Sequence, residues 1–213
     1  MSSQTEQPKP VISRATRLTL LCRGATLANR QSRLSSDDPL LPGEQARLRA
    51  LALQLRPFFP VFCAPERAAA ETAAVFSGDA ASCPALRDLD YGRWANRTIT
   101  DIAQQSPDDL QDWRTDPASS PHGGEPFLAA QARASVWLES LHSTGGNTLA
   151  VTHAIVLKLL FLHVIDAPLT SLWRIDVEPL AMLTLTSDGR RWALRSFGTQ
   201  LAAGSPPGEE PLG

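Results

Sequence analysis

The segment from Cys22 to Asn29 carries side chains suited to binding an oxyanion. Arg23 offers a fixed positive fork, Thr26 and Asn29 offer hydrogen bonds, and Gly24 lets the backbone approach a ligand closely. Taken alone, the same residues also fit a turn glycine beside a solvated arginine. The anion-loop interpretation therefore requires further polar groups delivered to the same place.

Two later segments supply such groups, Arg67 and His153, and each follows a short apolar run, as Arg23 does. These runs have the pattern of buried strands, and they cover residues 18–21, 60–63 and 147–152. Ligands in open α/β sheets bind just beyond the carboxyl ends of the strands. We therefore expect Arg23, Arg67 and His153 to meet at one edge of a sheet.

The sequence between these runs favours helices, so strand, loop and helix repeat along the chain. The pattern predicts an α/β fold, a three-layer α/β/α sandwich with a mostly parallel central sheet. Predicted helices include leucine-spaced residues up to Leu55, an alanine-rich stretch through Phe76, 127–141 and 154–164, with two weaker signals around Ile102 and Leu110; residues 181–197 read as two strands joined by an Asp-Gly turn.

Length and composition bound the class of protein. The 213 residues, 43% of them hydrophobic, suffice for one core, so we predict a single domain over 16–199 with disordered tails at 1–15 and 200–213. A net charge of −2 gives no general reason to expect nucleic acid or an anionic membrane as partner. Three cysteines without a CxxC pair, and the lack of a signal or membrane segment, favour the cytoplasm.

Five short motifs occur along most of this chain. They are Cys22-Arg23-Gly24-Ala25-Thr26 with Asn29, Cys63 with Arg67-Ala68 and Thr72-Ala73, Leu86-Arg87-Asp88 with Tyr91-Gly92-Arg93-Trp94, Gly123-Gly124-Glu125-Pro126, and Val151-Thr152-His153. In order and spacing they resemble the histidine phosphatase superfamily, the phosphoglycerate mutase-like family, from Arg17 to Phe197. That resemblance implies the same α/β fold.

The first motif departs from the family pattern where the chemistry occurs. In the family, its histidine attacks the phosphoryl group and forms a phosphohistidine, whereas here the resemblance places Arg23 at that position. It also places Cys22 at the family's first arginine and Cys63 at a strand-end serine. A guanidinium stays protonated and has no available lone pair, so Arg23 cannot take over the attack. Shifting the alignment by one residue makes Arg23 the phosphate clamp but still supplies no histidine.

The resemblance implies roles for the remaining polar residues. Arg67 matches a phosphate clamp, Asp88 the general acid, and His153 the second histidine of the site. The implied anion contacts are Arg23, Thr26, Asn29, Arg67 and His153. Alternatives that remain open are a salt bridge from Arg67 to Glu66 or Glu71 and a solvated turn for Asp88. Cys22 and Cys63 could bind a soft metal ion with His153, Cys22 could be a thiol nucleophile with a pKa lowered by Arg23, or both could be small buried apolar side chains.

The predicted function is a histidine phosphatase-like protein with a pocket for a small phosphorylated or anionic ligand and without phosphohistidine chemistry. It needs no cofactor or metal, while a protein partner or a second copy is left open. The alternative is an active enzyme, a phosphomonoesterase or a metabolite-processing enzyme, with His153 and Asp88 as acid and base. A mobile His122 could assist it, and Trp94, Trp113 and His122 around the 95–126 insertion would select the ligand.

Overall fold

The computed structural model describes residues 15–34 and 37–198, which form an α/β fold around a six-stranded mixed sheet. The strand order is β3-β2-β4-β1-β5-β6. Parallel pairing joins β3, β2, β4 and β1, while β5 is antiparallel to β1 and to β6. The strands are β1 Thr16–Cys22, β2 Val61–Cys63, β3 Ala81–Ser82, β4 Gly146–Thr152, β5 Met182–Ser187 and β6 Trp192–Gly198.

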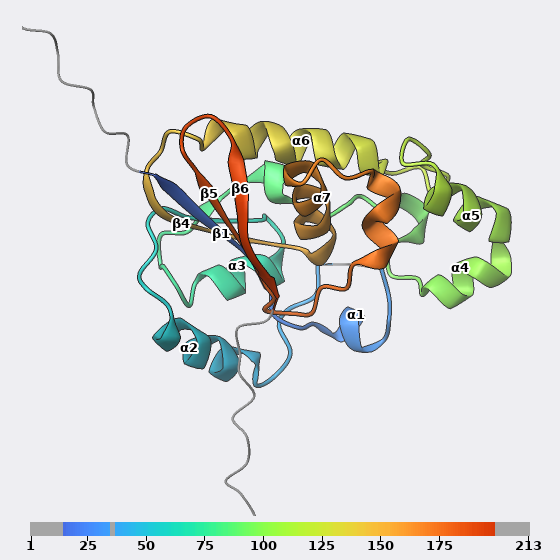
Figure 1. Ribbon diagram of the computed structural model, residues 1–213. Helices are drawn as coiled ribbons and strands as arrows, with labels where there is room; N and C mark the ends of the chain where they lie inside the picture. Colours follow the sequence, from blue (N-terminus) through green and yellow to red (C-terminus); the bar gives the residue numbers. More distant parts are fainter. Residues whose placement is uncertain (1–14, 35–36, 199–213) are drawn as a thin grey trace, which may run out of the picture.

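Helices cover the sheet from both sides, with α6 on one side and α2 and α3 on the other (Figure 1). The helices are α1 Leu27–Arg30, α2 Glu44–Gln54, α3 Arg67–Ala73, α4 Ile99–Gln105, α5 Pro107–Thr115, α6 Phe127–Ser140 and α7 Ala154–Val164, with 3₁₀ helices at Pro84–Leu86, Gly92–Trp94 and Leu169–Arg174. Leu18, Leu20 and Leu21 are fully buried, as expected for a central strand covered on both faces. None of the described helices is both long and apolar enough to cross a bilayer.

These observations confirm the predicted fold, and the predicted helix 154–164 has the observed bounds. The two-residue strand β3 and the short helix α1 were not predicted, because neither contains enough residues to show a periodicity. The predicted tails lie outside the described residues, apart from residue 15.

The insertion at 95–126 forms a second apolar core with the end of α7. Trp94 and Trp113 are buried at its centre, with ring centroids 5.5 Å apart in an edge-to-face arrangement. Leu159 and Leu162 of α7 join the same core. The helices α4 and α5 therefore pack onto the rest of the domain through this core.

Candidate functional site

Arg23 and His153 meet where the two central strands end. Arg23 follows β1 and His153 follows β4, and these strands are hydrogen-bonded neighbours in parallel register. The Arg23 N–H donates to the carbonyl oxygen of Thr152 at 2.8 Å, which ties the two strand ends together. Arg23 is 7% exposed and His153 is 3% exposed. Two predicted site residues thus lie in contact at the expected edge.

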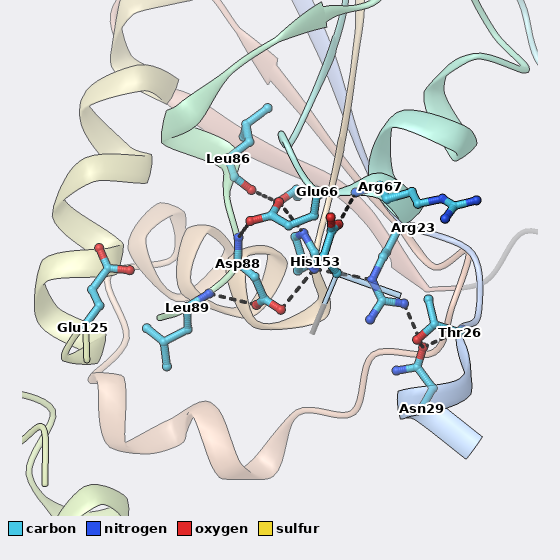
Figure 2. A network of polar contacts seen from close by, with 12 residues as sticks. Arg23, Thr26, Asn29, Glu66, Arg67, Leu86, Asp88, Leu89, Glu125 and His153 are labelled. Atoms are coloured by element: carbon cyan, nitrogen blue, oxygen red, sulfur yellow. Dashed lines mark hydrogen bonds and ion pairs between the residues drawn. The ribbon is translucent and has the colours of Figure 1, made fainter. Parts of the chain in front are cut away.

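His153 is held between two carboxylates (Figure 2). Its Nε2 lies 2.9 Å from Glu66 Oε2, and its Nδ1 lies 3.2 Å from Asp88 Oδ2. Glu66 also accepts a hydrogen bond from the Asp88 N–H at 3.1 Å through its other oxygen. Both imidazole nitrogens therefore have an acceptor, which favours the doubly protonated, charged ring.

The pKa of His153 is set by two opposing effects, burial and the neighbouring carboxylates. Burial lowers the pKa, but the charge of Asp88 and the hydrogen bonds to Asp88 and Glu66 outweigh it and raise it to about 9. For Glu66, burial raises the pKa, but the hydrogen bond and the charge of His153 outweigh burial and bring the pKa below its ordinary value. Arg23 Nε lies 3.4 Å from the same Nδ1 and can donate to it only when that nitrogen carries no proton, so the Arg23 contact competes with the Asp88 contact.

Arg23 is restrained by its own loop. Its Nη1 donates to the Gly24 carbonyl at 2.9 Å and to Asn29 Oδ1 at 2.7 Å. The Thr26 N–H and hydroxyl also donate to Asn29 Oδ1, at 3.0 and 3.1 Å. The predicted anion contacts Thr26 and Asn29 therefore lie beside Arg23, but they are engaged with each other and with Arg23.

The backbone donors of this loop are also occupied. The Gly24 N–H donates to Thr72 Oγ1 at 3.0 Å, and the Ala25 N–H donates to Glu44 Oε2 at 2.9 Å. A Cβ on Gly24 would lie 2.8 Å from Leu40 Cδ2, the end of a flexible side chain, so the protein itself packs closely against this glycine. The N–H groups of residues 23–26 therefore all have acceptors within the protein, and none is directed to a ligand.

Arg67 does not join Arg23 and His153. Its side chain is 59% exposed, pairs with Glu71 at 2.7 Å, and points away from His153 in Figure 2. This is the salt-bridge alternative left open above. An anion contact by Arg67 stays a prediction, and it would require the guanidinium to leave Glu71 and turn inward.

Glu66 takes the inward place beside His153, and the sequence-based prediction missed it. Glu66 stands at the N-cap position of α3 without a side-chain capping hydrogen bond, and Arg67 begins the helix. The Glu66 side chain contacts His153, whereas the Arg67 side chain pairs with Glu71. The available signal was an acidic residue three positions after the Cys63 strand end, but nothing in the residue types shows which neighbour faces inward. Tyr91 was missed too; burial, then the Asp88 charge, raise its pKa well above the ordinary value.

The three cysteines are free thiols. Burial raises the pKa of Cys22 to about 12, although the Arg23 charge opposes this, so the thiol is protonated and unsuited to nucleophilic chemistry. Cys63 is buried as well, and burial raises its pKa. No group of three or more His, Cys, Asp or Glu side chains among residues 15–34 and 37–198 is arranged to hold a metal ion.

His122 is packed in the core rather than near the site. It is buried between Trp94 and Trp113, its Nδ1 accepts the Gly124 N–H at 2.9 Å, and burial lowers its pKa. Trp94 and Trp113 are buried in the same cluster. These three rings are buried against one another in edge-to-face and tilted contacts, which gives them a structural role in place of the predicted selection of a ligand.

The Gly-Gly-Glu segment links the insertion to the site. Glu125 pairs with Arg87 at 2.7 Å and with Arg133 at 2.8 Å, and Arg133 Nη2 also donates to the Asp88 carbonyl at 2.9 Å. A Cβ on Gly124 would lie 2.1 Å from the Asp90 carbonyl oxygen, so only glycine fits there. Glu125 and Arg133 therefore position the backbone that carries Asp88.

The raised pKa of His153 predicts a stability that falls as the pH rises. The unfolded-state value is about 6.5, so the stabilisation is fully present below that pH and is lost as the pH rises through about 9. Glu66 affects stability at low pH, since its lowered pKa gives a stabilisation that is lost in acid. Between about pH 6 and about pH 8.5 we expect a loss of about 2 kcal/mol in urea unfolding.

The control is His163→Gln, which replaces an imidazole that faces solvent and should keep this dependence on pH. His153→Gln should flatten it. If the parent and His153→Gln lose equal stability over this interval, the assignment of a charged His153 fails.

The fold and this strand-end site together define the class of protein. The family model of the histidine phosphatase superfamily (branch 1) matches residues 18–200, so the chain belongs to that superfamily. It is 30% identical over 173 residues to the adenosylcobalamin/alpha-ribazole phosphatase of Salmonella typhimurium, covering 76% of this chain and 86% of the relative.

Solved structures agree in fold. A putative alpha-ribazole-5'-P phosphatase from Escherichia coli superposes with a TM-score of 0.77 at 25% identity, over 86% of this chain and 96% of that one. A mycobacterial glucosyl-3-phosphoglycerate phosphatase gives a TM-score of 0.76 at 22% identity, over 88% of this chain and its entire length, 100%. The predicted family is thereby confirmed.

Proposed function

We propose that this chain is a non-catalytic member of the superfamily, in which the strand-end site has become a closed ion cluster. The cluster contains two cations, Arg23 and His153, and two anions, Glu66 and Asp88. The supporting observation is the placement of His153 between the two carboxylates at 2.9 and 3.2 Å. A ring that is charged at neutral pH has no lone pair for attack on phosphorus.

The cluster also weakens the attraction for an anion. Each positive group already faces a carboxylate or a carbonyl oxygen, and the loop N–H groups donate to protein acceptors. A phosphate would therefore have to displace Glu66 or Asp88 from His153. We propose that small anions bind here weakly, and that the protein acts through binding, in the cytoplasm, rather than turnover.

The relatives named above are phosphatases, so the proposal must be tested against the alternative that this chain is an active phosphatase. Their activity would come to this chain only if Asp88 and His153 worked as acid and base. At neutral pH His153 is already protonated, so it could serve only as the acid of that pair, with Asp88 as the base.

The experiment is an assay of the full chain with p-nitrophenyl phosphate, beside Asp88→Asn purified in the same way. We expect both proteins to release nitrophenolate at the same background rate. Turnover by the parent that the Asp88→Asn variant loses would overturn the proposal. Because asparagine has nearly the same shape as aspartate, the control keeps the packing around His153 and removes only the carboxylate charge.

A further inference from the structure

A cavity lies away from the ion cluster, on the face of the sheet near the end of α2. Its volume is about 590 Å³, within the range of roughly 300–1,000 Å³ that small-molecule sites occupy. Arg17 lines it and precedes Arg23 by six residues on an extended strand, which separates them by roughly 20 Å. The cavity is therefore distinct from the family's strand-end site.

Two threonines on neighbouring strands, both buried, are among the residues that line this cavity. Thr19 of β1 and Thr184 of β5 are paired in register and are 4% and 2% exposed. Neither hydroxyl has a hydrogen-bond partner among the described residues. Buried hydroxyls are normally paired, so these two are available to a polar ligand atom in the cavity.

The remaining walls combine positive charge with apolar surface. Arg17 and Arg56 are exposed at the cavity, and neither guanidinium has a carboxylate partner within the described part of the chain. Leu55, Phe58 and Met182 supply the apolar contribution. Two unpaired arginines beside an apolar wall suit a molecule with an acidic group and an apolar body.

We propose that this cavity binds a small organic anion, an apolar ring or chain carrying a carboxylate, sulfonate or phosphate. Arg17 and Arg56 bind the acidic group, and Leu55 and Phe58 pack on the apolar part. The hydroxyls below them bind polar atoms of the ligand. The proposal does not depend on the absence of catalysis at His153.

The test uses 8-anilinonaphthalene-1-sulfonate, whose fluorescence rises in apolar sites, with the full chain. We expect saturable binding to one site that weakens about tenfold or more in Arg17→Gln/Arg56→Gln, a change that corresponds to ~1.4 kcal/mol. The matched control is Arg49→Gln, an exposed arginine of α2 outside the cavity lining. It should bind within about twofold of the parent, because no cavity charge changes.

A neutral ligand gives the second comparison. N-phenyl-1-naphthylamine has the same rings without the sulfonate, and its affinity should be weaker and equal in the parent and the double variant. Thr19→Val, which keeps the side-chain shape, should weaken the sulfonate probe. Absence of saturable binding, or equal loss in Arg49→Gln and in the double variant, would overturn the proposal. NMR chemical-shift changes of backbone amides on addition of the sulfonate probe would overturn it too if they were confined to the loop after Arg23.

Discussion

Replacing His153 with alanine is expected to lower the free energy of unfolding by about 3 kcal/mol at neutral pH. The imidazolium lies between Glu66 and Asp88, and its removal leaves two carboxylates near each other with Arg23 as the nearest cation. An uncompensated buried charge is costly because the protein interior solvates it poorly. Urea unfolding followed by tryptophan fluorescence measures the change.

The matched control is His163→Ala, which removes an exposed histidine from α7 and its 3.2 Å contact with Glu139. Exposed ion pairs contribute roughly 0–1 kcal/mol, so a small effect is expected there. Placing His153→Ala in a Glu66→Gln/Asp88→Asn background should reduce its cost by about half or more, because the two groups that faced the imidazolium are then neutral. Equal costs in both backgrounds would assign the loss to packing and contradict the ion-cluster interpretation.

The sheet could be predicted from sequence because its central strands are short apolar runs with a polar residue at each end. Burial of Leu18 and Leu20 on a central strand leaves a signal that a single chain shows directly. The antiparallel β5–β6 pair was visible through the Asp188-Gly189 turn. Strand order and the pairing of β3 depend on contacts between distant segments, which residue types alone do not encode.

The candidate site was only partly predictable, because residue types do not show in which direction each side chain points. Residue types place Arg23 and His153 at strand ends, and neighbouring parallel strands then bring them together. At the start of α3, however, Glu66 and Arg67 are adjacent and point in different directions. A residue's direction at a strand-to-helix turn depends on backbone torsions that composition does not fix, so the arginine was expected inside and the glutamate is found there.

The double variant Cys22→Arg/Arg23→His is expected to gain phosphatase activity, by about a hundredfold or more over the parent with p-nitrophenyl phosphate. That gain corresponds to ~3 kcal/mol in the activation barrier. The new histidine would stand at the end of β1, where the family resemblance places the nucleophile. The charges of Asp88 and Glu178 both reach the Cys22 side chain, so they would stabilise a buried guanidinium there, against the opposing charge of Lys158.

The single variant Cys22→Arg is the matched control and should remain inactive, because it adds the cation without a nucleophile. Denaturation in alkaline detergent during turnover of the double variant should trap a phosphoryl group on the new histidine, because the phosphorus–nitrogen bond survives in alkali; it is detected as an added mass on the peptide that contains it. A folded double variant with neither activity nor added mass would contradict the placement of Arg23 at the nucleophile position.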